Sequence, residues 1–187
     1  MSLSHEANRT NRVEAGTLWV NGVSKPGAAS TTAQWLVLTN ATLGGSGIIS
    51  NATVWVLGGT INPGTTNVAV FTVSSNVVFD VGAALTIDVT GSGTVAGTDY
   101  DQLLVKTPPG AVSGLANVAL TVNVVGSPAV DNHTLRVISG GGNYSSQSFL
   151  SLAVQGLAGR TLVPTYGNGF VDVQIKNNPR GLSVFFR

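Results

Sequence analysis

The sequence predicts an all-β fold, a right-handed parallel β-helix (a solenoid) with an irregular β cap at its C-terminal end. Three observations support this prediction. Charged residues make up 9 % of the 187 residues, far below the roughly 25 % of an average soluble protein, so the polar faces of surface helices are missing. Short runs rich in Val, Ile, Thr and Leu alternate with the period of two that is typical of strands. Gly and Asn recur between these runs.

The predicted strands follow one another at short intervals. The N-terminal half contains the runs TLWVNGV (17–23), WLVLTNATL (35–43), ATVWVL (52–57), VAVFTVSSNVVFDV (68–81) and ALTIDVT (84–90). The C-terminal half contains QLLVK (102–106), ALTVNVV (119–125), TLRVIS (134–139), FLSLAV (149–154) and FVDVQI (170–175). Each run is bounded by Gly, Asn, Pro or Ser, which end strands and form turns.

A soft repeat favours a solenoid over a β-sandwich. Related units begin at residues 16, 41, 59 and 83, at intervals of about 18–24 residues that fit one coil of a β-helix. Gly and Asn tolerate the positive φ that a tight corner requires, so they recur where coils turn. The β-branched residues fill the interior, and Thr, Ser and Asn face outward because stacked coils would place like charges about 5 Å apart.

The repeat pattern divides the chain into three segments. We expect residues 1–14 to be a polar N-terminal tail or the edge of a fragment, because the sequence opens in the middle of a pattern. Residues 15–96 form the β-helix coils. Residues 97–187 form the C-terminal coils and the capping region of the same domain, because loops lengthen there and Pro108, Pro109 and Pro164 cannot occupy regular ladder positions.

Alternation within each run predicts which side chains point into the coils. The expected inward residues are Leu18, Val20, Leu36, Leu38, Val54, Val56, Phe71, Val73, Leu85, Ile87, Leu104 and Val122.

Several steps in the sequence resemble a known family. The segments TLGGSG (42–47), GGTINPGT (58–65), TDYDQL (98–103) and DNHTLRVISGGG (131–142) are similar to the autotransporter-associated β-strand repeats of bacterial surface proteins. The resemblance covers roughly residues 15–175. It implies a right-handed β-helix, export to the cell surface and a role as a stalk or passenger domain in adhesion. It supplies no catalytic residues.

Composition excludes several classes of function. The net charge is +1 and the basic residues are scattered, so no positive stripe follows a phosphate backbone and nucleic acid is not an expected partner. The chain has no Cys, which excludes disulfides, thiolate metal sites and a thiol nucleophile. Polar residues interrupt the longest apolar stretch, 68–89, so we expect no membrane insertion by this segment. We also expect no metal and no cofactor.

Three pairs of titratable residues are candidate sites. Asp99 and Asp101 favour capped turns over calcium ligands, because the run lacks the D-x-D-x-D-G pattern. Asp131 and His133 lack a G-x-S-x-G nucleophile, so a loop histidine is favoured over a catalytic one.

Asp80 and Asp88 form the third pair, and they are candidates for the two carboxylates of a carbohydrate-cleaving β-helix. The sequence supplies no Arg or Lys close to them. We therefore assign no catalytic residue.

Aromatic residues give the candidate ligand site. Trp19, Trp35 and Trp55 are spaced near the coil repeat, so they could form a strip that stacks on sugars. The favoured alternative is that they are buried or cover the N-terminal end of the stack. Tyr100, Tyr144 and Tyr166 lie in turn-rich stretches and could add to a surface patch.

The sequence therefore predicts a non-enzymatic structural or adhesive segment of a secreted bacterial surface protein, a β-helix stalk. One alternative is a carbohydrate-binding or carbohydrate-cleaving β-helix. Another is a self-associating, fibre-forming module. The expected partners are a cell-surface glycan or protein, or further copies of the chain.

Overall fold

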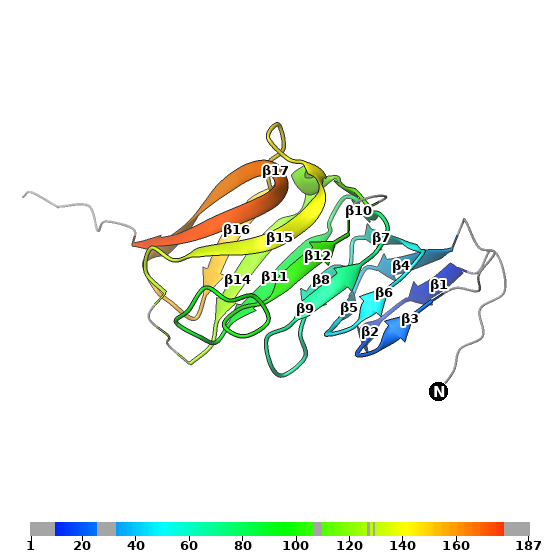
Figure 1. Cartoon of the computed structure of the whole chain (residues 1–187), viewed down its shortest axis with the longest axis horizontal. Coiled ribbons are helices and arrows are strands. Elements are labelled where there is room, and N and C mark those ends of the chain that lie inside the picture. The colour runs from blue at the N-terminus through cyan, green and yellow to red at the C-terminus, as the bar shows by residue number, and fades with distance from the viewer. Residues whose placement is uncertain (1–9, 26–32, 107–109, 127, 129, 178–187) are drawn as a thin grey trace, which may run out of the picture.

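A computed structural model describes residues 10–25, 33–106, 110–126, 128 and 130–177. Its strands form three sheets, and strands that are far apart in the sequence lie side by side in each sheet. Figure 1 shows the coils stacked one beside the next from the N-terminal to the C-terminal strands. All pairings are parallel except the last one in the third sheet. The predicted all-β, parallel β-helix fold is confirmed.

Each sheet takes one strand from successive coils. Sheet A contains β1 (Thr10–Val13), β4 (Gln34–Leu38), β7 (Thr53–Leu57), β10 (Val77–Phe79) and β13 (Val112–Ser113). Sheet B contains β2 (Gly16–Trp19), β5 (Ala41–Gly45), β8 (Thr60–Pro63), β11 (Ala84–Val89), β14 (Ala119–Val124) and β16 (Ser151–Gln155). Sheet C contains β3 (Val23–Ser24), β6 (Ile48–Ile49), β9 (Val70–Val73), β12 (Gln102–Val105), β15 (Thr134–Asn143) and β17 (Arg160–Asn177).

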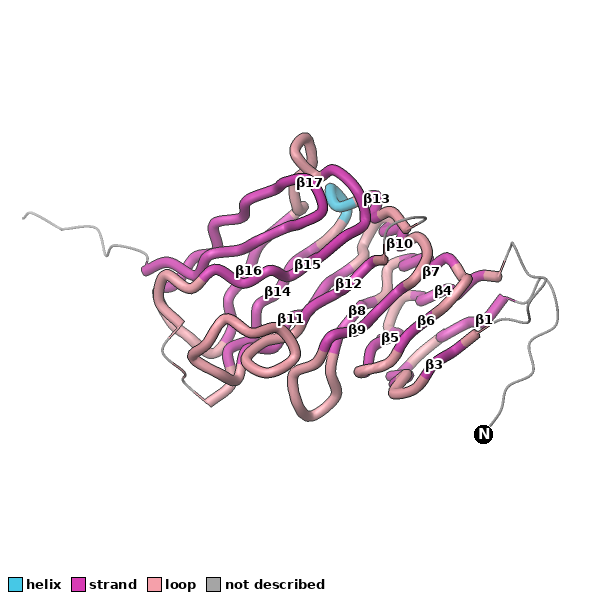
Figure 2. The backbone as a smooth tube through the Cα atoms, viewed as in Figure 1, coloured by secondary structure: helices cyan, strands magenta, loops and turns pink. Residues whose placement is uncertain are grey.

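The corners between sheets A and B explain the recurring Gly and Asn. Asn40 and Gly58 occupy equivalent corners of neighbouring coils, with φ angles of 65° and 77°. This left-handed backbone is costly for most side chains and is tolerated by Gly and Asn. The chain therefore turns from one sheet to the next within two residues at these corners. The short 3₁₀-helix η1 (Leu115–Asn117), drawn in cyan in Figure 2, follows the same corner of a later coil.

Side chains of the same kind stack from coil to coil inside the β-helix. One such column, called here the aliphatic ladder, runs through sheet B. Its members are Leu18, Leu43, Ile61, Leu85, Leu120 and Leu152. The four central members are fully buried or nearly so, whereas Leu18 and Leu152 at the two ends are each 37 % exposed. In a central coil the ladder residue is covered by the coils on both sides. In an end coil it is covered on one side only and stays partly exposed.

Most of the predicted inward residues are confirmed, and those that are buried lie in the central coils. The fully buried ones are Val54, Val56, Phe71, Val73, Leu85, Ile87 and Val122. Val20 is partly buried against the core. Leu18 is more exposed than predicted because it belongs to the first coil of the stack.

Two strands face the opposite way from the prediction. In β4, Trp35 and Val37 point inward, and the predicted Leu36 and Leu38 point outward. In β12, Leu103 and Val105 are buried, and the predicted Leu104 is partly exposed. Both runs are apolar at consecutive positions, so alternation did not reveal which face was buried, and a one-residue shift moves every side chain to the other face.

The N-terminal segment differs from the tail that was predicted. The first strand, β1, lies within residues 1–14 and pairs with β4 along its whole length. Parallel stacking continues beyond residue 96, through β12, β14 and β16. The irregular region is confined to the end of the chain, where β17 pairs antiparallel with β15.

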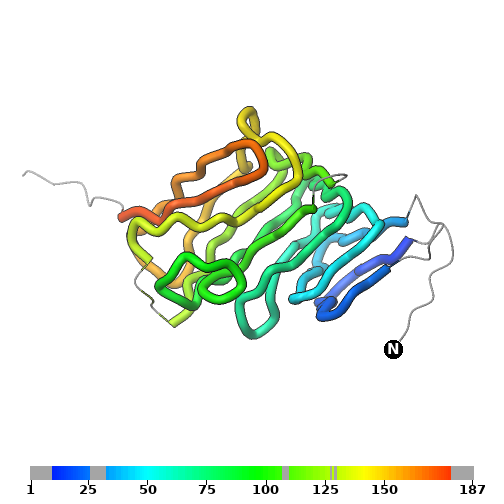
Figure 3. The backbone as a smooth tube through the Cα atoms, in the orientation of Figure 1, coloured from blue at the N-terminus to red at the C-terminus, as the bar shows by residue number. Residues whose placement is uncertain are grey.

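The last strand closes the stack by folding back on itself. Arg160 and Asn177, at the two ends of β17, both donate hydrogen bonds to the Asp131 carboxylate. Figure 3 shows residues 160–177 running out and returning beside β15. The first limb contributes the buried Leu162, and Tyr166 packs against Phe149 with 5.9 Å between the ring centroids. These apolar groups cover the C-terminal end of the interior.

Candidate functional site

The three tryptophans do not line one face. Trp35 stacks between Asn11 and Val54 in an interior column of sheet A and is only 6 % exposed. Trp55 follows Leu36 on the outer surface of the same sheet, and Trp19 lies on the outer surface of sheet B. Trp35 pairs with Val54, and Trp55 pairs with Leu36. The two tryptophans are therefore one residue apart in register, and their side chains lie on opposite faces of the sheet. The single aromatic strip therefore does not form.

Trp19 lies at one end of a polar surface on sheet B. This polar face consists of the outward residues Thr42, Thr60, Asn62, Thr86, Asp88, Thr121 and Asn123. The indole of Trp19 crosses Gly44, where a Cβ atom would lie 2.9 Å from Cζ3 of the indole and 1.7 Å from the carbonyl oxygen of Asn62. Gly44 thus allows the indole to lie flat on the sheet, with 38 % of Trp19 exposed to solvent.

The polar face offers hydrogen-bonding groups in register. The Nδ2 group of Asn123 donates to Oδ1 of Asp88 at 2.9 Å, one coil away. Oδ1 of Asn62 is buried and accepts no hydrogen bond from the described residues. An unpaired buried acceptor is costly, and this oxygen lies beneath the surface that a ligand would touch.

Trp55 has different surroundings on sheet A. Its outward neighbours in adjacent strands are Leu36 and Val78, and the outward pair Leu38 and Leu57 lies next to them. This apolar row is half-buried, and Trp55 is its most exposed member at 36 %. The two exposed tryptophans therefore have matched exposure on chemically different faces.

Asp101 is a buried carboxylate that joins two coils. Its Oδ1 atom accepts the Ala69 N–H at 2.7 Å, and its Oδ2 atom accepts the Asp88 N–H at 3.0 Å. The side chain is fully buried. Burial raises the pKa of Asp101 to about 7, against the lowering effect of the two backbone donors.

Its sequence neighbour Asp99 caps a turn, with Oδ2 accepting the Val95 N–H. Asp99 and Asp101 were predicted to cap turns. Asp99 does so, whereas Asp101 connects two neighbouring coils through its hydrogen bonds. Within the described ranges, no group of three or more His, Cys, Asp or Glu residues could hold a metal ion. No helix among the described residues has the length and apolar character to cross a membrane.

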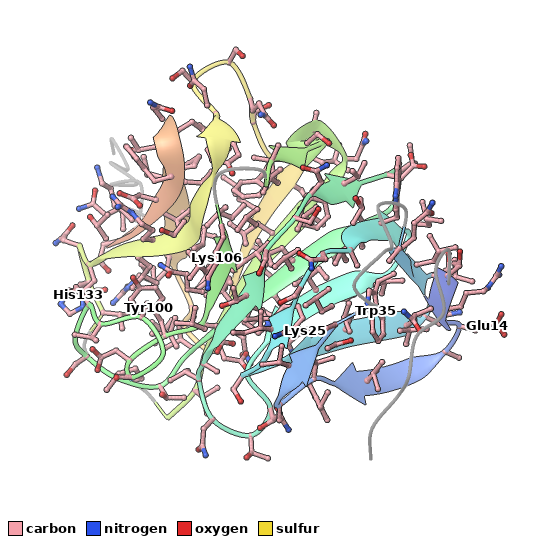
Figure 4. All side chains as sticks on the ribbon, turned by 45° about the vertical axis from the view of Figure 1, so that its right-hand side comes forward. Glu14, Lys25, Trp35, Tyr100, Lys106 and His133 are labelled. Carbon is pink, nitrogen blue, oxygen red and sulfur yellow. The ribbon has the colours of Figure 1, made fainter. Side chains whose placement is uncertain are left out.

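Asp131 and His133 do not form a catalytic pair. Asp131 accepts two hydrogen bonds from Arg160, at 2.6 and 3.0 Å, and a third from Asn177. The Nδ1 atom of His133 is buried and makes no hydrogen bond with the described residues. Figure 4 shows His133 on the same side of the molecule as Tyr100 and away from Trp35. The carboxylate therefore anchors the two ends of β17 and does not orient the imidazole.

The other acidic pair is also kept apart. Asp80 lies at the corner before β11, where its Oδ1 atom accepts the Val81 N–H. Asp88 lies near the opposite end of β11. The strand therefore separates the two carboxylates that were candidates for cleaving a glycosidic bond.

Two of the tyrosines are interior residues that the sequence placed on the surface. Tyr144 is fully buried and its hydroxyl donates to the Gly140 carbonyl at 2.6 Å, while burial raises its pKa. Tyr100 is also buried, and its hydroxyl accepts the Arg136 N–H. Their turn-rich surroundings gave no sign of burial, because the residues that cover them come from other coils. Only Tyr166 is partly exposed.

Arg136 forms an ion pair on the outside of sheet C that the sequence did not predict. Its Nε and Nη2 groups donate to the two carboxylate oxygens of Asp172 at 2.9 and 3.2 Å. The guanidinium also lies 4.6 Å from the centre of the Phe170 ring. Pairing with Asp172 raises the pKa of Arg136. The pair joins β15 to β17 and so holds the cap in place.

No protein-family model matches this chain, and no curated protein matches it. The resemblance to autotransporter-associated repeats therefore stays a prediction. The polar contacts of the interior join coils, and the exposed tryptophans are the main features of the outer faces.

Proposed function

We propose that this chain is a non-enzymatic structural or adhesive segment of a secreted bacterial surface protein, in which the β-helix acts as a stalk. The observation that carries the proposal is the continuous stacking of three parallel sheets around one apolar interior. In a solenoid each coil is stabilised by its neighbours, so the stack resists local opening.

Side chains that join successive coils support the same role. The amide of Gln102 donates to the Arg136 carbonyl at 2.8 Å, and the amide of Asn117 donates to the Phe79 carbonyl at 3.2 Å. Asp101 accepts backbone donors from two neighbouring coils. These contacts use buried polar groups to hold coils together, which suits a segment whose function is stiffness.

Limited proteolysis tests the stiffness. We expect thermolysin to cut first in the exposed loop 90–99, and to leave β4 to β11 uncut, because cleavage requires local unfolding. Mass spectrometry of a digestion time course would identify the first cuts. Early cleavage inside β7, β8 or β11 would contradict a rigid stalk.

A separate experiment tests whether the protein lies on the cell surface. Antibodies raised against the chain should label intact cells of its source. Labelling that requires permeabilised cells would argue against a surface protein.

A second function, carbohydrate binding, is favoured by the exposed indole of Trp19 beside the polar face. Sugars stack their apolar faces on aromatic rings, and Asn62, Asp88 and Asn123 could bond to hydroxyl groups. Cleavage would need two carboxylates at a set separation, and Asp88 is the one acid among the described outward residues of sheet B. We therefore propose binding and not cleavage.

Trp19→Ala and Trp55→Ala form a matched pair for this second function. On a glycan array, we expect Trp19→Ala to lose binding at least tenfold, and Trp55→Ala to keep it, because only Trp19 adjoins the polar face. Circular dichroism of both variants controls for folding. Equal loss in both variants, or no binding by the folded wild-type chain, would reject the carbohydrate proposal and leave the stalk proposal standing.

A further inference from the structure

The last strand of sheet B, β16 (Ser151–Gln155), has a free edge within the described part of the chain. It pairs with β14 on one side, and none of the described strands pairs with it on the other. The Leu150 N–H donates to the Val118 carbonyl at 2.9 Å. The Ala119 N–H donates to the Ala83 carbonyl, just before β11, so Leu120 and Val122 turn their backbone groups toward β16. Because Leu120 pairs with Leu152 and Val122 with Val154, the N–H and C=O groups of Ser151, Ala153 and Gln155 point toward β14, and those of Leu152 and Val154 point away from it.

This edge lacks the features that normally prevent pairing between molecules. Edge strands are usually very short or carry charges or proline. Sheet A ends in β13, which is two residues long, and β17 of sheet C contains Arg160 and Pro164. By contrast, β16 has five residues, SLAVQ, with no charge and no proline.

Apolar surface is exposed at the same edge. Leu152, the C-terminal member of the aliphatic ladder, is 37 % exposed, and the adjacent Leu150 is 64 % exposed. In the preceding coils the equivalent positions, Leu85 and Leu120, are buried by the next strand. One more strand would bury Leu152 in the same way.

We propose that β16 is a dimerisation strand that pairs antiparallel with β16 of a second copy of this chain. An antiparallel pair centred on Ala153 places the free backbone groups of Leu152 opposite those of Val154 from the other copy. The side chains of the same two residues then meet on the inner face. Because the strand is uncharged, no like charges face each other.

A twofold pair explains the geometry better than end-to-end stacking does. Head-to-tail stacking would require β1, β2 and β3 of one copy to meet all three sheets of the next. The β17 hairpin lies beyond β15 at the C-terminal end of sheet C and prevents that arrangement. The antiparallel β16 pair is self-complementary, so it closes into a dimer and does not extend into a fibre. This inference does not depend on the stalk or carbohydrate proposals.

A single cysteine tests the proposed axis, because the chain has no natural Cys. The two Ala153 residues would form a non-hydrogen-bonded antiparallel pair, in which Cα atoms lie about 4.5 Å apart, within the range that a disulfide spans. We expect Ala153→Cys to form a covalent dimer under mild oxidation. The control Thr121→Cys, outward on the neighbouring strand β14, should stay monomeric on a non-reducing gel. Equal cross-linking of both variants would overturn the proposal.

Sedimentation velocity over a concentration series tests the non-covalent dimer. The full chain should show a reversible monomer–dimer equilibrium. Val154→Pro, which removes an N–H that faces away from β14, and Leu152→Lys should each weaken it at least tenfold. The control Val81→Lys changes an exposed corner residue and should have no effect.

Three outcomes would overturn the proposal: a wild-type monomer at every concentration, a dimer that survives Val154→Pro, or open-ended association. A chain ending at residue 177 that dimerises when the full chain does not would show that residues 178–187 occupy the edge instead. Circular dichroism of each variant ensures that loss of association is not loss of folding.

Discussion

Replacing Ile87 with aspartate is expected to destabilise the β-helix by several kcal/mol. Ile87 is fully buried in β11, between the apolar columns of neighbouring coils. The variant removes a large side chain and places a carboxyl group where no described polar side chain can pair with it. Burying an unpaired polar or charged group costs roughly 2–7 kcal/mol, and losing the packing adds about 2–5 kcal/mol. Few domains have a total stability much above 15 kcal/mol.

The measurement is equilibrium unfolding in urea, followed by circular dichroism. Thr60→Asp is the matched control, because Thr60 faces outward on the neighbouring strand β8. It should change the free energy of unfolding by about 1 kcal/mol or less. If the two variants were equally stable, the inward assignment of Ile87 would be wrong.

The stability of the protein is expected to fall as pH rises from about 4 to about 7, because of Asp101. Its pKa is about 7 in the folded chain and 3.8 in the unfolded chain. Between these values the unfolded chain has released the proton that the folded chain still holds. Raising the pH therefore favours unfolding, at about 1.4 kcal/mol per pH unit. The full contribution of this residue is on the order of 4 kcal/mol and is present at low pH.

Comparison with Asp101→Asn isolates this effect from other titrating groups. Asparagine cannot ionise, so the difference in unfolding free energy between wild type and variant should change with pH. Urea unfolding at pH 5 and pH 8 measures that change. Asp101→Asn should be less stable than wild type at pH 5, since its NH₂ group faces one of the two backbone donors. At pH 8 the difference in unfolding free energy between Asp101→Asn and wild type should be smaller. Parallel pH profiles would show that Asp101 does not titrate in this range.

The sequence was sufficient to predict the fold class and much of the interior. ALTIDVT alternates apolar and polar residues cleanly, and Leu85 and Ile87 are buried as predicted. Runs without alternation gave the wrong face: WLVL in β4 and QLLV in β12 are almost wholly apolar. In these strands the buried face is determined by pairing with adjacent coils, and a single sequence does not contain that pairing.

The surface features were harder to predict for the same reason. The spacing of Trp19, Trp35 and Trp55 matched the coil repeat, but a one-residue difference in register places Trp35 inside and Trp55 outside. The Asp101–Ala69 and Arg136–Asp172 bonds join residues that lie 32 and 36 positions apart in the sequence. No local pattern in the sequence marks either contact.

The corners between sheets B and C change length from coil to coil. The connection is short between β5 and β6, longer across residues 64–69, and longer still across 90–101. The strands on either side keep their parallel pairing throughout. Insertions at this corner are therefore absorbed without disturbing the stack, and Figure 1 shows these loops along one edge of the molecule. A peptide grafted into 90–101 would be displayed from a fixed support, and grafts in successive coils would be spaced by multiples of about 4.8 Å.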